Sequence, residues 1–376
     1  MEQNRPIRVL QVFTILNLGG AETNLMNYFR HLDPNQLQFD FLVHREEEGY
    51  YEEEIKAKGS KIFRLRPIHP FTLGKYKKEV DDFFRLHAGD YDIVHGQLSE
   101  LGVYIYEAAK KYGVPVRIAH SHNSKMDMDM KAPFRVWWKH RLRRSANAFF
   151  SCGYESSVWL FGAKNADRAF IMNNAVEVER FRPDPETAAL YRKELNITSP
   201  FSFLHIGRFA PQKNHRFLIA IFAEVVKRLP EAKLFLVGEG ELKADIVAQV
   251  QALKLQDNII FLGKRGDVNA LMQTCNYFLF PSLFEGFSVA FVEAQASGMF
   301  SFISDGIPGE SVLLKDQVAV ISLKETAAAW AERITEMLKA TSSRDEKAYE
   351  KIKAAGYDVH DNTERLYEKY RRILNA

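Results

Sequence analysis

The stretch LFEGFSVAFVEAQASG (283–298) comes just after the apolar run YFLF (277–280). An apolar run, a loop with glycine and serine, and then a helix-like segment are typical of the strand–loop–helix units that build parallel sheets. The stretch carries two carboxylates, because Glu285 stands in the loop and Glu293 stands inside the helix-like segment. A solvated helix face produces the same spacing, so this pair alone does not indicate a binding site.

The same alternation of apolar runs and amphipathic segments fills the chain and predicts an α/β protein with parallel sheets covered by helices on both faces. The predicted strands are 7–15, 39–43, 61–65, 92–96, 116–120, 147–151 and 169–173, and then 201–206, 232–238, 258–263, 276–280, 300–304 and 318–322. The segment VERFRPDPET (178–187) is interpreted as a linker, because it holds two prolines and few apolar residues. We therefore expect two Rossmann-like domains, with boundaries at 1–180, 181–360 and, for a final helix, 361–376.

Composition restricts the function further. The 376 residues suffice for two domains with separate cores, and 46% hydrophobic and 26% charged residues are typical of a soluble globular protein. The net charge of +3 gives no indication of nucleic-acid binding, and Cys152 and Cys275 are too few for a disulfide framework or a thiolate metal site. With no run near ~20 apolar residues and no signal-peptide layout at the N-terminus, we expect a cytoplasmic protein.

Two loops at predicted strand ends carry charged side chains next to predicted helix N-termini. In IGRFAPQKN (206–214), Arg208 and Lys213 stand beside a helix N-terminus, a combination that favours anions such as phosphate. In the second loop, the amides of Phe287, Ser288 and Val289 are expected to be free to donate, and carboxylates accept hydrogen bonds from paired hydroxyls. Sugars are the commonest ligands with paired hydroxyls, so a phosphate bound by the cations beside a sugar bound by the carboxylates describes a nucleotide sugar. The alternatives are a surface loop with solvated cations at 206–214 and an exposed helix residue at Glu293.

Two further strand ends carry weaker signals. LNLGGAET (16–23) is rich in glycine but lacks G-x-G-x-x-G and the P-loop lysine, which argues against a nicotinamide or ATP site. AHSHN (119–123) offers two histidines without a nearby carboxylate to complete a metal site. We therefore predict no metal and no cofactor, and we expect one histidine to supply a polar contact or to handle a proton.

Together these motifs resemble the retaining glycosyltransferases of family 4, which have the GT-B architecture of two Rossmann-like domains facing across a cleft. The resemblance covers nearly the whole chain, and it implies an acceptor-side domain at 1–180, a nucleotide-sugar-binding domain at 181–360 and a final helix at 361–376 that packs back on the N-terminal domain. The matching motifs are Glu-x7-Glu as EGFSVAFVE (285–293), GRFAPQKN (207–214), GGAE (19–22), HSHN (120–123), NNAVEVERFRP (173–183) and SDGIPGE (304–310). The opening IRVLQVFTILNLGGAETNLMNYFRHLD is similar to the branch that builds bacterial capsular polysaccharides or exopolysaccharides.

The resemblance implies roles for the matching residues. Arg208 and Lys213 would hold the donor diphosphate, Glu285 would contact the donor sugar, and Glu293 would contact the ribose. His120 would approach the transferred carbon. The expected catalytic residues are thus His120, Arg208, Lys213 and Glu285. The expected donor-binding residues are Gly19, Gly20, Gly207, Arg208, Lys213, Gly238, Lys264, Arg265, Glu285, Gly286, Phe287, Ser288, Val289 and Glu293.

The resemblance also has departures. Ala175 stands where the family usually has glycine, and SDGIPGE places glycines at 306 and 309 where relatives vary. We expect neither departure to touch the main site residues. The expected reaction moves a sugar from a nucleotide-diphosphate-sugar, with a UDP-sugar favoured, to a hydroxyl of a glycan or lipid-linked acceptor, with retention and without a metal.

KAPFRVWWKHRLRR (131–144) is a basic amphipathic segment with tryptophans. Such a helix suits an anionic membrane surface, so Arg135, Trp137, Trp138 and Lys139 are expected on a membrane or acceptor side, at the inner face of the cytoplasmic membrane. The alternative is that the aromatic side chains are core and the cations a solvated face. The preceding loop (124–132) is interpreted as a lid.

Other functions remain open at this level. A nucleotide-sugar epimerase would need a set of acid and base residues that we do not identify. A non-catalytic nucleotide-sugar binder or partner subunit would not need Arg208, Lys213, Glu285 and Glu293 together. A dehydrogenase is disfavoured because the dinucleotide fingerprint is missing.

Overall fold

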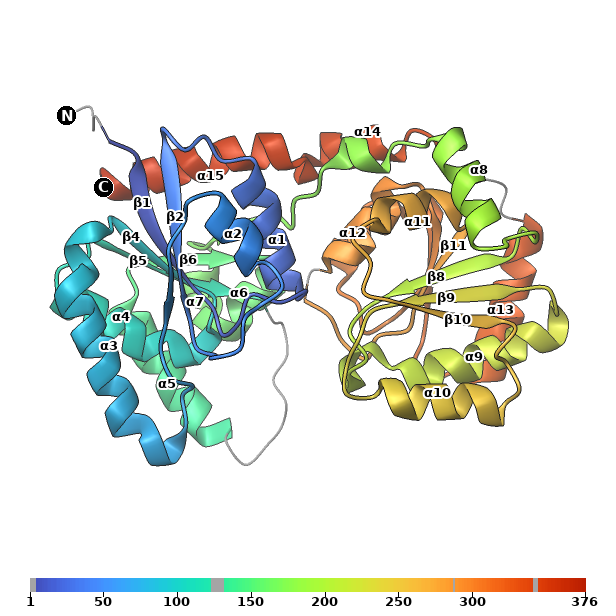
Figure 1. Cartoon of the computed structure of the whole chain (residues 1–376), viewed down its shortest axis with the longest axis horizontal. Helices are drawn as coiled ribbons and strands as arrows, with labels where there is room; N and C mark the ends of the chain where they lie inside the picture. Colours follow the sequence, from blue (N-terminus) through green and yellow to red (C-terminus); the bar gives the residue numbers. More distant parts are fainter. Residues whose placement is uncertain (1–4, 123–131, 287, 341–343) are drawn as a thin grey trace. The chain divides into compact units, whose positions relative to one another are not determined.

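The chain folds into two compact α/β units, each built around one parallel sheet (Figure 1). The first unit comprises Met1–Ala175 and Val359–Ala376, and the second comprises Val176–Asp358. The sequence placed the first boundary at 180, whereas the first unit ends at Ala175. The residues described in this computed structural model are 5–122, 132–286, 288–340 and 344–376.

The first sheet has seven strands in the order β3-β2-β1-β4-β5-β6-β7, and the paired strands run parallel. Chain order reverses between β1 and β4, which are direct neighbours. The strands are β1 (Ile7–Val12), β2 (Leu37–Val43), β3 (Ile62–Arg64), β4 (Ile93–Gly96), β5 (Val116–Ser121), β6 (Ala148–Ser151) and β7 (Phe170–Ile171).

Helices cover both faces of this sheet, as the apolar residues on both sides of its strands predict. On one face, Phe39 and Phe41 of β2 pack in a core with α1 and with Leu366 and Tyr370 of α15, which are fully buried. On the other face, α3, α4, α5 and α6 form a second core. The helices are α1 (Gly20–Arg30), α2 (Glu52–Ala57), α3 (Leu73–His87), α4 (Val103–Lys111), α5 (Ala132–Ser145), α6 (Tyr154–Phe161), α7 (Ala163–Ala166) and α15 (Val359–Leu374).

The second sheet has six parallel strands in the order β10-β9-β8-β11-β12-β13. They are β8 (Ser202–Ile206), β9 (Lys233–Val237), β10 (Ile259–Gly263), β11 (Tyr277–Phe280), β12 (Phe300–Ser304) and β13 (Val318–Ile321). Side chains of α9, α10 and α13 pack in one core with these strands. The helices are α8 (Pro185–Glu194), α9 (His215–Arg228), α10 (Lys243–Ala252), α11 (Val268–Thr274), α12 (Val289–Ala296), α13 (Ala327–Ala340) and α14 (Ala348–Ile352).

The segment 178–187, interpreted as a linker from the sequence, belongs to the second unit and is not an irregular connection. It contains a 3-10 turn at Val178–Phe181 and the start of α8. The Asp184 side chain caps α8 by accepting from the amides of Glu186 and Thr187, and Pro185 occupies the first turn, where its missing N–H costs nothing. The prolines that indicated a linker therefore mark a helix start.

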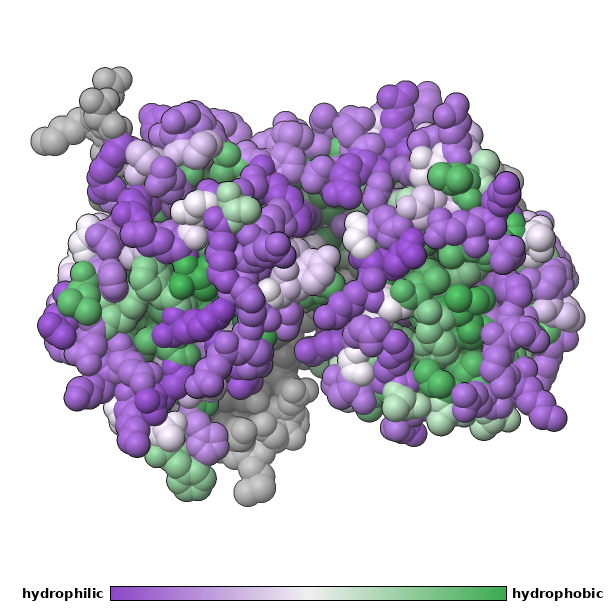
Figure 2. Space-filling model, in the orientation of Figure 1, coloured by the Kyte–Doolittle hydropathy of each residue, from purple (hydrophilic) through white to green (hydrophobic). Residues whose placement is uncertain are grey.

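Polar side chains dominate the face of each unit shown in Figure 2, with apolar patches between them. Among the residues that the structure describes, no helix combines the length and apolar character that crossing a membrane requires.

Two loops at the carboxyl edge of the second sheet approach so closely that one position requires glycine. Gly238, after β9, has φ +140°, and a Cβ built on it would lie 2.1 Å from the carbonyl oxygen of Gly207, after β8. The amide of Gly207 donates to the Val237 carbonyl and that of Phe209 to the Glu239 carbonyl, both at 3.0 Å. These bonds hold the two loops together.

We expect Gly238→Ala to destabilise the protein by about 1–3 kcal/mol, because alanine rarely adopts this backbone conformation and its methyl group would clash with a carbonyl oxygen. The matched control is Gly266→Ala, since a Cβ there meets nothing within 4 Å. Chemical denaturation of both variants measures the difference. Equal stability of Gly238→Ala and Gly266→Ala would contradict this account of the loop contact.

Candidate functional site

The candidate site of the second unit lies where chain order reverses in its sheet. Strand β8 pairs with β9 on one side and with β11 on the other. Loops diverge at such a point, and ligands of open α/β sheets bind there, outside the carboxyl ends of the strands. The loop after β8 carries Arg208 and Lys213, and the loop after β11 carries Glu285.

The structure brings Lys213 and Glu285 into direct contact. The Lys213 Nζ donates to Glu285 Oε1 at 2.7 Å, and the side chains are 17% and 6% exposed. The Nζ also lies 4.5 Å from the centre of the Phe280 ring, which restricts it on the other side. A cation and a carboxylate are therefore held side by side in a largely desolvated position.

Further hydrogen bonds join the two loops and fix this geometry. The Leu283 amide donates to the Gln212 carbonyl at 2.8 Å, and the Asn214 side chain donates to the Pro281 carbonyl at 3.1 Å. The Gln212 side chain donates to the Phe284 carbonyl at 3.0 Å and approaches Glu285 Oε2 at 3.4 Å. Sequence reasoning missed Gln212, although it stands next to Lys213 in the same motif.

Arg208 and Gly207 complete the loop after β8. The Arg208 side chain is exposed, so it is accessible to a ligand. A Cβ on Gly207 would lie 3.1 Å from the methylene carbons of Lys213, so glycine gives that side chain its room. An exposed guanidinium and a positioned ammonium on one short loop can bind an anion.

One expectation about departures from the family pattern is wrong. Gly306 was expected not to touch the main site, but its carbonyl accepts from the Glu285 amide at 3.3 Å. A Cβ on Gly306 would lie 2.3 Å from the Leu283 carbonyl oxygen. Glycine at 306 therefore lets this loop lie against the loop that carries Glu285.

Helix α12 begins beside Glu285, as the sequence predicted. Ser288 is its N-cap and Val289 its first residue, while Phe287 lies outside the described residues. Glu293 lies inside the helix and is partly buried. Burial raises the pKa of Glu293 to about 7, against the opposing charge of Arg180. Such a perturbed carboxyl group is a frequent feature of binding sites.

The remaining predicted residues of the second unit, Gly238, Lys264 and Arg265, differ in their surroundings. The Gly238 amide donates to the Gly263 carbonyl at 2.9 Å, which places the loop after β9 beside the end of β10. Arg265 binds Asp267 through two of its nitrogens, so its guanidinium has an intramolecular partner. Lys264 is exposed.

In the first unit, Gly19 and Gly20 stand where β1 leads into α1, with Gly19 as the N-cap. His120 lies at the end of β5 and is 1% exposed. Its Nδ1 lies 3.0 Å from His95 Nε2, and burial lowers the pKa of both histidines, that of His95 to about 3. His95, which the sequence analysis did not single out, also stands at a strand end.

Helix α5 has features of both a membrane-facing helix and a helix whose aromatic side chains pack in the core. Trp138 donates to the Tyr104 hydroxyl at 3.0 Å, while Trp137 is 53% exposed. Lys139 donates to the carbonyl of Trp159 at 2.9 Å and thereby binds the C-terminal turn of α6, where cations are favourable. The side chain of Arg135 and the loop 124–131 lie outside the described residues.

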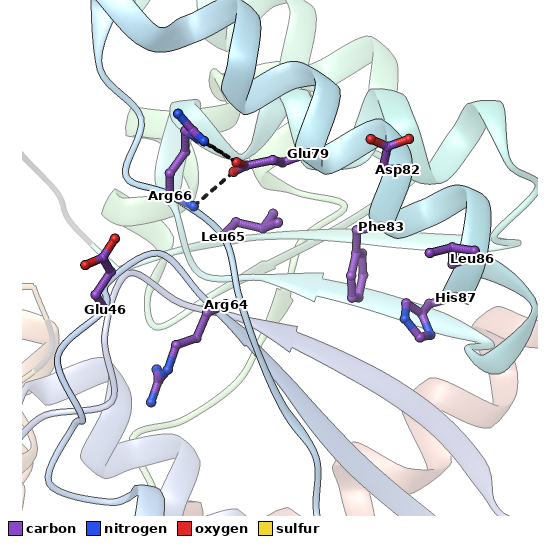
Figure 3. Close-up of a pocket in the computed structure, with 9 residues that line it drawn as sticks. All are labelled: Glu46, Arg64, Leu65, Arg66, Glu79, Asp82, Phe83, Leu86 and His87. Carbon is purple, nitrogen blue, oxygen red and sulfur yellow. Dashed lines mark hydrogen bonds and ion pairs between the residues drawn. The ribbon is translucent and has the colours of Figure 1, made fainter.

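An open hollow beside β3 and α3 is separate from these residues (Figure 3). Leu65 and Phe83 are among its lining side chains, and Arg66 and Glu79 form an ion pair at its edge. This pair neutralises itself, and Glu46, Arg64 and Asp82 also line the hollow, so its charged side chains are of both signs.

Two family models match the chain. Residues 19–188 match the glycosyl transferase 4-like domain, and residues 188–358 match glycosyl transferases group 1. The chain is 32% identical to the "Putative glycosyltransferase EpsF" of Bacillus subtilis, with 96% of each chain covered. It is 26% identical to the UDP-Gal:alpha-D-GlcNAc-diphosphoundecaprenol alpha-1,3-galactosyltransferase of Escherichia coli, covering 83% of this chain and 82% of the relative.

The capsular polysaccharide biosynthesis glycosyltransferase CapH of Staphylococcus aureus is 24% identical, with 77% of this chain and 79% of the relative covered. The crystal structure of Anabaena HepE in complex with UDP-glucose has the same fold, with a TM-score of 0.79 at 18% identity and 97% and 100% coverage. With its two parallel-sheet units and these matches over nearly its full length, the chain belongs to the family 4 glycosyltransferases of GT-B type.

Proposed function

We propose that this glycosyltransferase moves a sugar from a nucleotide-diphosphate-sugar, with a UDP-sugar favoured, to a hydroxyl of a glycan or lipid-linked acceptor in surface polysaccharide biosynthesis. The observation that carries the proposal is the Lys213–Glu285 contact, with Arg208 exposed on the same loop. This arrangement offers cations to a diphosphate and a carboxylate to sugar hydroxyls at adjoining positions.

The proposed chemistry depends on charge in the leaving group. When the bond between the sugar carbon and the phosphate oxygen breaks, the diphosphate gains negative charge. Arg208, Lys213 and the amide groups at the start of α12 would stabilise that charge, and preorganised donors of this kind are usually the largest catalytic term. These groups would act without a divalent ion, so we propose a metal-independent reaction.

We propose that Glu285 positions the sugar and is not a covalent nucleophile. Its carboxylate is already bound by Lys213 and approached by Gln212, which orients it as an acceptor for sugar hydroxyls. Retention through a covalent intermediate requires a second carboxyl group about 5 Å away. In the proposed reaction, the acceptor attacks the same face of the sugar that the diphosphate leaves. The acceptor oxygen bonds to the sugar carbon as the phosphate leaves, and the departing diphosphate takes the hydroxyl proton.

The names of the relatives support the donor and acceptor classes. The Escherichia coli relative is named for UDP-Gal and for a diphosphoundecaprenol acceptor, and HepE was crystallised with UDP-glucose. CapH is named for capsular polysaccharide biosynthesis. We therefore place a UDP-sugar and a lipid-linked or glycan acceptor first among the candidates, with Glu293 binding the ribose.

We further propose that the surface around α5 contacts anionic membranes. Val136 and Trp137 are 64% and 53% exposed, and the guanidinium of Arg141 lies 4.4 Å from the centre of the Trp137 ring. Phe71, just before α3, is 94% exposed. The Tyr104 ring joins the two helices, because Lys77 of α3 and Arg141 of α5 both lie over it. Exposed aromatic side chains among cations fit a membrane interface.

We expect Lys213→Ala to lower turnover by about 10²–10³-fold at saturating donor, because it removes a charge-stabilising donor. The assay is nucleotide release from the activated sugar that a thermal-shift panel of UDP- and GDP-sugars selects. Lys227→Ala, which removes an exposed lysine of α9, is the matched control and should leave turnover unchanged. Near-normal turnover of a folded Lys213→Ala variant would remove Lys213 from the mechanism.

We expect Glu293→Gln to raise the melting temperature more at pH 8 than at pH 5. The folded-state pKa of Glu293 is raised from 4.5 to about 7, so the unfolded chain releases this proton first. Stability therefore falls as pH rises from about 4.5 to about 7, and the glutamine variant avoids this loss. The control is Glu336→Gln on the exposed surface of α13. An equal gain at both pH values would contradict the raised pKa.

We expect Trp137→Glu to weaken binding to vesicles that contain anionic lipid, measured by flotation. The variant replaces an exposed aromatic side chain by a negative charge, which the anionic lipid surface repels. Leu190→Glu is the matched control, because Leu190 is 63% exposed on α8 of the second unit. If the wild-type protein does not float with these vesicles, or if both variants float like it, this surface is not a membrane site.

A further inference from the structure

A chain of polar side chains runs through the interior of the first unit and ends at His120. Its members come from neighbouring strands and from the last helix of the protein. Gln11 of β1 and His95 of β4 are direct register partners, and β5 is the next strand in the sheet. In order along the hydrogen bonds, the members are His122, Gln97, Gln11, Tyr370, His95 and His120.

The first part of this chain of hydrogen bonds runs from His122 through the side-chain amides of Gln97 and Gln11. His122 Nε2 lies 2.5 Å from Gln97 Oε1, and Gln97 Nε2 lies 3.2 Å from Gln11 Oε1. An amide oxygen accepts only and an amide nitrogen donates only. His122 Nε2 therefore carries a proton, and each bond in this part donates in the same direction, away from His122.

The second part carries this direction to His120. Gln11 Nε2 donates to the Tyr370 oxygen at 3.4 Å, so the tyrosine proton is available for His95 Nδ1 at 2.7 Å. A neutral imidazole that accepts at Nδ1 carries its proton on Nε2. His95 Nε2 then donates to His120 Nδ1 at 3.0 Å. Burial lowers the pKa of both histidines, which keeps them neutral.

His120 is the end of the chain. Its Nε2 is buried and has no hydrogen-bond partner among the described residues, although buried polar atoms are normally satisfied. Reversing every bond is the alternative arrangement, and it would leave a lone pair on this nitrogen instead of a proton. The reversed arrangement would need the side-chain amides of Gln97 and Gln11 to be turned over, so their orientation in the structure selects the direction in which His120 Nε2 carries the proton.

We propose that this chain of hydrogen bonds holds His120 as an uncharged donor with its proton on Nε2. Tyr370 and His95 are then positioning residues for His120. Resting on the proposed function, the inference assigns His120 to donating a hydrogen bond to a ligand oxygen, not to accepting a proton. The hydroxyl group that completes the chain comes from α15, about 250 residues after His120 in the sequence.

Nitrogen-15 NMR of histidine-labelled, ligand-free protein tests this chain of hydrogen bonds independently of catalysis. His→Asn variants assign the His95 and His120 resonances. We expect both residues to show a protonated, pyrrole-type Nε2 and an unprotonated, hydrogen-bonded Nδ1. In Tyr370→Phe, the Nδ1 resonance of His95 should lose its hydrogen-bond shift, and the His120 resonances should change with it.

Tyr28→Phe is the matched control. Tyr28 is also a buried tyrosine of the first unit, but its hydroxyl donates to the Asn173 carbonyl at 2.8 Å and lies outside the chain. This variant should leave the His95 and His120 resonances unchanged. A pyridine-type Nε2 on His120 in the wild-type protein, or His120 resonances that do not respond to Tyr370→Phe, would overturn the proposal.

Activity provides the second readout. Loss of the hydrogen-bond partner that orients a metal-binding histidine typically costs about 10–100-fold in activity. We expect an effect of the same order from Tyr370→Phe on kcat, and none from Tyr28→Phe. The KM for the donor sugar should change less than kcat. If the NMR result holds but Tyr370→Phe turns over normally, the positioning role is wrong. If the wild-type protein does not transfer sugar, the proposed function fails while the NMR result stands.

Discussion

The ion pair between Lys213 and Glu285 is the contact on which the site in the second unit depends. Neither residue is near the other in sequence, and the parallel sheet brings them together because β8 and β11 are neighbours with loops that diverge. Removing a charge pair from water is costly unless further hydrogen bonds compensate. The bonds from Gln212 and Asn214, and the close approach of Gly306, provide such support around the pair.

In the proposed function, this pair is also the state from which catalysis starts. A diphosphate would compete for the lysine and sugar hydroxyls would compete for the carboxylate, so a donor with both parts replaces one internal contact by two external ones. A free nucleotide or a free sugar would satisfy one partner and leave the other unmatched. The pair thereby favours a ligand that joins a phosphate to a sugar.

The polar groups of the two units differ in charge and in burial. The second unit presents charged groups on loops at its sheet edge. The first unit buries neutral imidazoles and amides, whose hydrogen bonds define a direction but carry no net charge. Low polarity strengthens such a network and makes each unsatisfied atom costly. His120 Nε2, which has no partner among the residues that the structure describes, and Glu293, whose pKa is raised, are therefore the atoms and groups that a ligand is expected to satisfy.

Sequence reasoning found what depends on local pattern. From strand ends and their loops it predicted that Arg208, Lys213, Glu285 and the start of α12 lie at one edge of the sheet, and the structure places them there. It missed contacts that arise only from packing, such as Gln212 with Phe284 and Gly306 with Glu285. The resemblance implied that the last helix packs on the first domain, and it does. The contact between Tyr370 and His95 could not be predicted, because it depends on which residues of that helix face the sheet. The prolines at 183 and 185 were misread because capping by Asp184 was overlooked.

The most direct test of the central claim is a crystal structure of the protein with a bound, non-hydrolysable UDP-sugar analogue. We expect the diphosphate to contact Arg208 and Lys213, the sugar hydroxyls to contact Glu285, and the distance between Lys213 Nζ and Glu285 Oε1 to exceed the present 2.7 Å. A diphosphate bound elsewhere, with the Lys213–Glu285 contact intact, would contradict the account.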